Sequence, residues 1–220
     1  MTGSEGVRSL PEALIHYEKL FKSQPQKRDG LGPLRQKAFS RFREIGFPTL
    51  RQENWKYTNV GPITKTPFEL AASVSNGLTP EKINESLLAP PDGPVFVFLN
   101  GFYSEKFSHI TDLAPGVEAG SLARALEKDS EIVKKHLSEI APYENDGFTA
   151  LNTALMEDGA FLFLPEGASL KKPVYLVFIS LSDKKRVTVQ PRNLMVLEKG
   201  SQATVIETYI SFSKEPYFTN

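Results

Sequence analysis

The residues best suited to acid–base chemistry in this chain are carboxylates that lie close together in the sequence. Glu157 and Asp158 are adjacent, and Glu144 and Asp146 are two residues apart. A glycosidase or a lyase needs carboxylates that face the same bond. Adjacent side chains of an extended chain point to opposite sides, so Glu157 and Asp158 are badly placed to share one reaction. We therefore expect no catalytic residue among them.

Metal ligands are equally poorly supported. The histidines His16, His109 and His136 are widely spaced, and none has a His, Asp or Glu four residues later, the spacing of a helical metal site. Cysteine is absent, which excludes disulfides, thiolate catalysis and cysteine ligation of zinc or an iron–sulfur cluster within these residues. We expect no metal-binding and no cofactor-binding residue.

Motifs for covalent catalysis and phosphate binding are missing as well. The chain contains no G-x-S-x-G nucleophile elbow and no G-x-x-x-x-G-K-[ST] phosphate loop. Any ATP chemistry would therefore belong to a partner.

The charge balance predicts neither nucleic-acid nor membrane binding. Lys and Arg together number 26, and Asp and Glu together also number 26, so no net charge attracts the chain to a polyanion. No apolar run is long enough to cross a bilayer, and the N-terminal segment MTGSEGVRSL lacks the pattern of a secretory signal. We expect a cytoplasmic protein.

Residues 1–155 are predicted to form a mostly helical N-terminal domain. Apolar stripes of helical spacing run from Leu10 to Phe21 and from Leu31 to Ile45, and further helices are expected after Thr79, over 121–128, over 130–140 and around 148–155. The exception is a β-hairpin, in which a strand over 94–99 precedes the turn Asn100-Gly101 and a weaker return strand covers 102–107.

Residues 156–220 have a different pattern and are predicted to begin a β domain. Five apolar runs follow one another, at 160–164, 174–181, 187–189, 194–197 and 203–210. They do not alternate between apolar and polar residues, which indicates strands that are covered on both faces.

The gaps between these runs hold recurring tight corners. Acidic residues and glycines meet at 156–159, 165–167 and 198–200, and a repeat of short strand and corner is typical of a coil of stacked strands. The interior of the coil would bury one strand face, and the N-terminal helices or a partner would bury the other. An antiparallel sandwich of two sheets is the alternative.

The final residues, EPYFTN, form neither a capping helix nor a polar last turn. A coil that stopped there would leave unpaired backbone. We therefore expect residues 1–220 to be a fragment, or the open end of the coil to dock onto another surface.

Three segments occur in the order expected for a known family. The first contains Gly46, Pro48, Glu53 and Trp55-Lys-Tyr-Thr58; the second runs from Phe148 to Phe178 and the third from Arg192 to Tyr209. Together they resemble the SufB/SufD family of the SUF iron–sulfur cluster assembly machinery. The Trp-Lys-Tyr-Thr segment and the N-terminal helices favour its SufD branch.

The resemblance implies an α+β fold, in which a helical N-terminal domain precedes the first turns of a truncated, right-handed parallel β-helix. It also implies a non-catalytic scaffold that binds a SufB-like homologue and a SufC-like ATPase. A transient iron–sulfur cluster is expected only on the full-length complex, because the family's proposed cluster residues have no match before Asn220.

Two other functions remain open at this stage. A β-helix enzyme could act on a polysaccharide or an acyl donor, although the glycine spacing lacks the six-residue repeats of left-handed acyltransferases. A homo-oligomerisation module, such as a homodimer, could pair its edge strands with those of a second copy.

Two surface segments are candidates for partner contacts. Trp55 and Tyr57 could form an aromatic docking patch, but we expect the tryptophan to pack onto its own helices. The charged segment Ser182–Arg186 could bind an anion or an acidic partner, but a solvated turn between two strands is the more ordinary interpretation.

Overall fold

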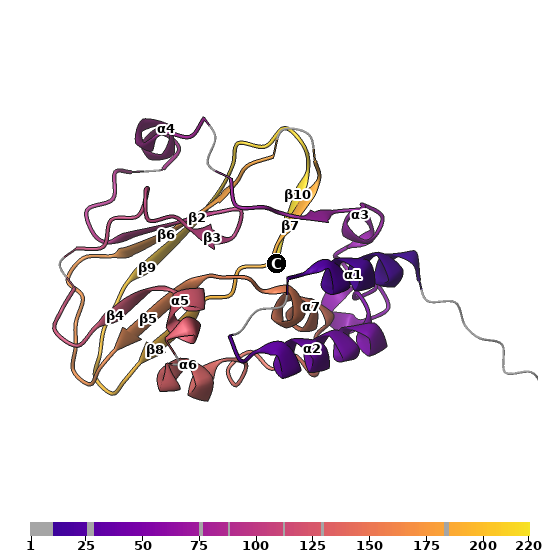
Figure 1. Ribbon diagram of the computed structural model, residues 1–220, viewed down its shortest axis with the longest axis horizontal. Helices are drawn as coiled ribbons and strands as arrows, with labels where there is room; N and C mark the ends of the chain where they lie inside the picture. The colour runs from indigo at the N-terminus through magenta and orange to yellow at the C-terminus, as the bar shows by residue number, and fades with distance from the viewer. Residues whose placement is uncertain are drawn as a thin grey trace, which may run out of the picture.

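The computed structural model describes residues 11–25, 29–74, 77–87, 89–111, 113–128, 130–182 and 185–220. Its helices are α1 (Glu12–Ser23), α2 (Gly32–Ile45), η1 (Glu53–Trp55), α3 (Gly61–Thr64), α4 (Pro80–Glu85), α5 (Leu122–Glu127), α6 (Glu131–His136) and α7 (Gly147–Leu155). Its strands are β1 (Glu69–Leu70), β2 (Val95–Leu99), β3 (Phe102–Tyr103), β4 (Glu118–Ser121), β5 (Ala160–Leu164), β6 (Val174–Ser180), β7 (Val187–Val189), β8 (Leu194–Leu197), β9 (Val205–Ser211) and β10 (Tyr217–Thr219). The fold is α+β, as predicted (Figure 1).

The helices α1, α2 and α7 pack together at one end of the molecule (Figure 1). Their shared core is aromatic: the ring of Tyr17 meets the rings of Phe42 and Phe47 edge-on, with centroids 6.1 and 5.2 Å apart. Leu151 and Leu155 of α7 are fully buried in the same cluster. The apolar stripes of the sequence therefore face one another. Leu10, predicted to begin the first stripe, lies outside the described residues.

The last six strands pair in a regular order. β5 lies parallel to β8, β6 to β9, and β7 to β10, so each strand pairs with the third strand after it. The described strands belong to three separate sheets, and every pairing among these six strands is parallel. The antiparallel two-sheet sandwich is therefore wrong for this part of the chain.

Strands from before residue 155 extend these sheets. β2 pairs in parallel with β6, β1 pairs in parallel with β7, and β4 pairs antiparallel with β5. The prediction of one small hairpin before residue 155 missed β1 and β4. Neither segment carries an apolar pattern that would predict a strand. Each is a strand because its backbone pairs with a strand that is remote in the sequence. Residues on the two sides of the predicted domain boundary thus share sheets.

Strands β5 and β6 are covered on both faces, which explains their unbroken apolar sequence. Alternate residues of β5 and β6, such as Leu162 and Leu176, point into one common cluster with Phe96 and Phe98 of β2. The other face of β6 packs against Ile83 of α4, and Phe161 of β5 packs against residues of α5 and α6.

Local sequence signals set several element ends. The side chain of Thr79 accepts a hydrogen bond from the N–H of Lys82 and so caps α4. Asn100 and Gly101 have φ angles of 51° and 85°, which confirms the predicted turn between β2 and β3. The return strand is shorter than expected, since β3 ends at Tyr103. Helix α6 ends at His136 rather than at Ile140.

Candidate interaction surface

Three strands leave one edge unpaired within the described part of the chain. β8, β9 and β10 each pair on one side with an earlier strand and lie last in their sheets. β9 is the longest of them, and Ile206 and Tyr209 on it are 39% and 47% exposed. An open edge of this kind offers backbone N–H and C=O groups to a further strand.

An aromatic ladder ends at this open edge. Phe98 of β2, Phe178 of β6 and Tyr209 of β9 occupy one register position on three neighbouring strands. Their rings stack with centroids 4.8 and 4.9 Å apart and with 14° between the planes of each pair. Such stacking fixes the strand register. This ladder was not predicted from the sequence, where its signal is an aromatic residue in each of the three strand segments.

The phenol of Tyr209 should titrate late. Partial burial, and then the carboxylate of Glu207, whose oxygen accepts a hydrogen bond from the phenol at 3.0 Å, raise the pKa of Tyr209 to about 12. Because tyrosine in an unfolded chain ionises near pH 10, this residue stabilises the fold below pH 10, and the contribution is lost as the pH rises from 10 to 12. Tyrosinate absorbance during an alkaline titration should show one fewer late-titrating phenol in Tyr209→Phe. A loss of absorbance confined to the phenols that titrate near pH 10 would contradict the assignment.

The carboxylate of Asp158 is a structural centre between segments. Its oxygens accept hydrogen bonds from the hydroxyl of Ser121 at 2.8 Å and from the N–H groups of Tyr103 and Ala123, both at 3.0 Å. The N–H of Gly159 adds a fourth at 2.8 Å. Asp158 is only 8% exposed. It therefore joins β3, the end of β4 and the first turn of α5 to the start of β5.

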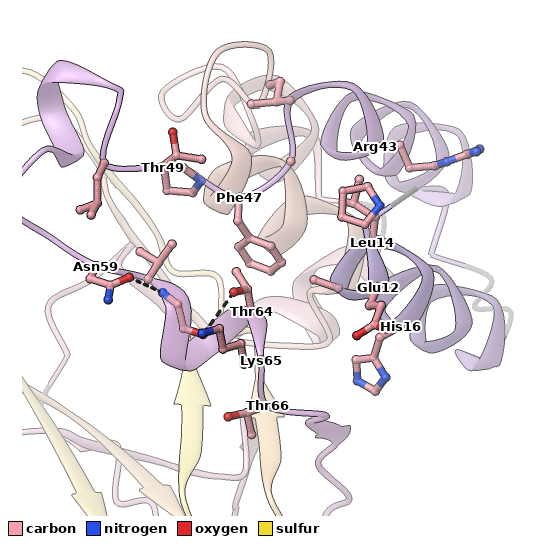
Figure 2. A pocket seen from close by; sticks show the side chains of 18 of the residues that line it. Glu12, Leu14, His16, Arg43, Phe47, Thr49, Asn59, Thr64, Lys65 and Thr66 are labelled. Carbon is pink, nitrogen blue, oxygen red and sulfur yellow. Dashed lines mark hydrogen bonds between the residues drawn. The ribbon is translucent and has the colours of Figure 1, made fainter. Parts of the chain in front are cut away.

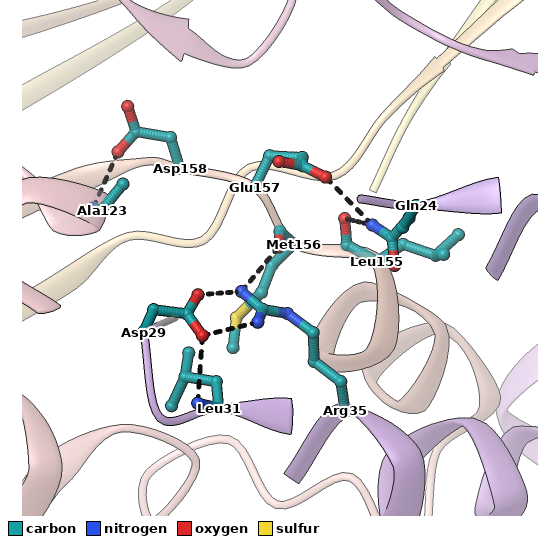
Figure 3. Close-up of polar contacts among 9 residues, drawn as sticks. All are labelled: Gln24, Asp29, Leu31, Arg35, Ala123, Leu155, Met156, Glu157 and Asp158. Carbon is teal, nitrogen blue, oxygen red and sulfur yellow. Dashed lines mark hydrogen bonds and ion pairs between the residues drawn. The ribbon is translucent and has the colours of Figure 1, made fainter. Parts of the chain in front are cut away.

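Glu157 points elsewhere. Gln24, at the end of α1, donates to the carboxylate of Glu157 and to the carbonyl of Leu155, both at 3.1 Å. Figure 3 shows Glu157 directed to Gln24 and Asp158 directed to Ala123. The two adjacent side chains therefore point to different segments, as expected for neighbours in an extended chain. Asp146 likewise serves as a cap, because its side chain accepts from the N–H of Thr149 at 2.6 Å.

A second connection joins α2 to the same short segment. Arg35 makes two hydrogen bonds to the carboxylate of Asp29, at 2.9 and 2.6 Å, and donates to the carbonyl of Met156 at 3.4 Å (Figure 3). The two charged side chains are 11% and 9% exposed. The helical end of the molecule is thus fastened to the residues that lead into β5.

The three histidines lie in unrelated places. His16 Nε2 is 2.6 Å from the carbonyl oxygen of Phe68. His109 exchanges two backbone hydrogen bonds with Val95, each 2.8 Å long, and His136 ends α6. Over the described ranges, no three His, Asp or Glu side chains gather closely enough to hold a metal ion.

The two aromatic residues of the Trp-Lys-Tyr-Thr segment have different surroundings. Trp55 is partly buried, and its ring lies 5.2 Å from the ring of Phe148 on α7. Tyr57 is 90% exposed, and the ammonium group of Lys56 lies 5.1 Å from its ring centroid. The expectation that the tryptophan packs onto its own helices is confirmed, whereas Tyr57 faces solvent.

Substitutions should separate these two roles. Trp55→Ala should lower the free energy of unfolding by about 1–2 kcal/mol, because a half-buried ring contact is lost. Tyr57→Ala should change it by less than about 0.5 kcal/mol, as exposed positions do. Urea unfolding of both variants measures the difference, and equal losses would show that Tyr57 is not free of the core.

The charged segment before β7 makes ordinary surface contacts where it is described. Lys185 pairs with Glu69 at 2.6 Å, and Arg186 lies 3.6 Å from Glu215. All four side chains are well exposed, so these pairs add little stability. Asp183 and Lys184 lie outside the described residues.

A comparison with known families identifies the chain. The sequence model described as "SufBD protein N-terminal region" matches residues 14–176. The chain belongs to the SufBD family. The match covers the helical end, β1 to β5 and the start of β6, so it includes both connections described above.

Individual SufBD relatives match larger shares of the chain. An iron–sulfur cluster assembly SufBD family protein of Synechocystis is 29% identical over 84% of this chain and 42% of its own length. The iron–sulfur cluster assembly protein SufD of Escherichia coli is 23% identical over 97% of this chain and 47% of its own length. The iron–sulfur cluster assembly protein SufD of Bacillus subtilis is 25% identical over 89% of this chain and 45% of its own length. The chain spans less than half the length of these relatives.

Within the described residues of this SufBD family member, none of the helices combines the length and the apolar character that a membrane span requires.

Proposed function

We propose that this chain serves iron–sulfur cluster assembly as a scaffold without catalytic residues of its own. The observation that carries the proposal is the family match over residues 14–176, together with relatives that are named as iron–sulfur cluster assembly proteins. The internal use of Asp158, Glu157 and Asp146 supports a structural role for the best candidate carboxylates.

The architecture of this scaffold would be a right-handed parallel β-helix behind the helical end. β5 to β7 would form its first turn and β8 to β10 its second, since each strand of the first turn pairs in parallel with its counterpart in the second. The buried cluster shared by β2, β5 and β6 supports an interior that runs along such a coil. A stack of this kind is stiff because each turn is hydrogen-bonded to the next.

The partners would be a SufB-like homologue and a SufC-like ATPase in the cytoplasm. The ATPase would supply the phosphate chemistry for which this sequence has no motif. The iron–sulfur cluster would be cargo of the assembled complex, because this segment has no cysteine to hold one.

Co-purification tests this function. The full-length protein, expressed with the SufB-like and SufC-like proteins of the same organism, should elute with both from a size-exclusion column with light-scattering detection. The complex should also carry iron and sulfide after anaerobic reconstitution. Three folded proteins that elute separately would contradict the proposal. A homodimer that excludes both partners would instead support the oligomerisation module.

A further inference from the structure

A wide groove opens at the helical end of the molecule, far from the exposed face of β9 (Figure 1). It has a volume of about 1290 Å³ and is lined by α1, the end of α2 with the residues that follow it, and the segment around α3. None of its lining residues belongs to β8, β9 or β10. Figure 2 shows Phe47 above Thr64 and Lys65, with Leu14 and Glu12 to its right.

The floor of the groove is apolar, and its polar groups are already satisfied. Leu14 and Val60 are nearly buried beneath it, and Phe47 is half-buried. The N–H of Gly61 donates to the side chain of Asn59 at 2.9 Å, as Figure 2 shows, and His16 lies 2.6 Å from the carbonyl of Phe68. The floor therefore offers apolar area and few converging donors.

The size and shape of the groove favour a polypeptide over a small molecule. Small-molecule pockets usually enclose about 300–1000 Å³ and fix their ligand with a few converging polar groups. This groove is larger, and its free charged groups stand on the rim. An apolar floor within a charged rim is the usual arrangement of a protein interface, and a groove between helices commonly takes an amphipathic helix. Leu50 adds an apolar side chain at the rim that is 53% exposed.

The rim charges select the partner's chemistry. Arg51 and Lys65 line the groove, and neither has an ion pair within the described residues. Arg43 also lines it, but its guanidinium points away from Phe47 in Figure 2 and interacts electrostatically with the carboxylate of Glu18. Of the two lining carboxylates, Glu44 is paired with Arg41 at 2.6 Å, so only Glu12 is left to oppose the two cations Arg51 and Lys65. Although the whole chain is neutral, this rim is basic.

We propose that this groove binds an acidic amphipathic helix of a partner protein, with the helix's apolar stripe on the floor and its carboxylates against Arg51 and Lys65. The inference goes beyond the proposed function, because it adds a second contact that leaves the strand edges free. A partner could therefore hold the helical end while another chain pairs with the sheet.

Fluorescence anisotropy with designed peptides tests the groove on the full-length protein. The probe is a labelled helix of about 15 residues with a leucine stripe and flanking glutamates, a length near the minimum for helix formation. A second peptide has lysine in place of each glutamate, and a third has the acidic composition scrambled to remove the stripe. The acidic amphipathic peptide should bind at least tenfold more tightly than either of the others.

Charge reversal on the rim supplies the matched comparison. Arg51→Glu with Lys65→Glu should weaken binding of the acidic peptide at least tenfold and improve binding of the lysine peptide. Lys171→Glu with Lys199→Glu makes the same change in net charge at exposed positions outside the groove, and should leave both affinities within about twofold. Thermal unfolding of each variant checks that it is folded.

Several results would overturn the proposal. It fails if the scrambled peptide binds as well as the amphipathic one, because the apolar floor is then unused. It fails if both charge-reversed pairs weaken binding equally, because the attraction is then general. It also fails if a single-stranded oligonucleotide displaces the acidic peptide while the peptide itself binds only weakly. None of these outcomes depends on the co-purification result, so the two proposals fail separately.

Discussion

Gly159→Ala should abolish most of the folded protein. A Cβ atom at this position would lie 1.9 Å from the carbonyl oxygen of Arg192, 2.4 Å from its carbonyl carbon and 2.8 Å from its nitrogen. These are backbone atoms that cannot rotate away, and the N–H of Arg192 also donates to the carbonyl of Asp158 at 3.0 Å. Moving Arg192 would therefore disturb the pairing of β5 with β8. We expect a loss of about 4 kcal/mol or more, which is a large part of a domain's stability.

Gly200→Ala is the matched control for this prediction. Gly200 has a φ of 72°, but an added Cβ would meet only one atom, 4.0 Å away. Its cost is the left-handed backbone alone, about 1 kcal/mol. Soluble yield and thermal midpoint, measured side by side, should rank the wild type, Gly200→Ala and Gly159→Ala in that order. A Gly159→Ala protein as stable as the control would mean that β5 and β8 do not approach as the structure shows.

The strands after Gly159 could be placed from sequence because their apolar runs stop at glycine, proline or charge. β5, β7 and β8 have the predicted bounds, and β6 and β9 differ from them by one or two residues at their ends. The starts of helices also have a local signal in the sequence. Thr79, Ser121 and Asp146 each accept a hydrogen bond with the side chain at the start of a helix.

Pairing partners could not be predicted in the same way. β4 has the sequence Glu-Ala-Gly-Ser, with no apolar pattern, and it forms because the edge of β5 accepts its backbone. The parallel pairing of Phe98 with Phe178 joins residues 80 positions apart (178 − 98). No local pattern in either segment predicts the strand with which it pairs. Side-chain patterns thus locate strands, whereas neighbours are chosen by the packing of the whole chain.

For the candidate sites, too, the sequence predicts the separate segments but not how they come together. The Asp-Gly corner at 158–159 was recognised as a corner, but its hydrogen-bond partners come from segments around residues 103 and 121. The helices that line the groove were predicted separately, whereas the groove depends on how α1 and α2 lie against the segment around α3. Its two rim cations, Arg51 and Lys65, do not stand out in a chain with 26 basic residues.

Asp158→Ala should be the most damaging side-chain truncation among the chain's candidate acid–base residues. It removes the acceptor for the hydroxyl of Ser121 and for the N–H groups of Tyr103 and Ala123. Each buried donor left without an acceptor costs about 1–3 kcal/mol, so we expect a total loss of about 3–5 kcal/mol. Urea unfolding measures this loss, and faster hydrogen exchange at the amides of Tyr103 and Ala123 would localise it.

Two further substitutions decide whether the hydrogen bonds or only the volume of Asp158 matters. Asp158→Asn keeps the volume and one acceptor oxygen, but it turns an NH₂ group toward either the N–H of Tyr103 or the donors around Oδ1. An intermediate loss of about 2 kcal/mol is expected. Glu157→Gln keeps the acceptor for Gln24 and should cost less than about 1 kcal/mol. If Asp158→Asn were as stable as the wild type, shape alone would hold β3 and α5 at the start of the strand stack, and Asp158 would not be the structural centre described above.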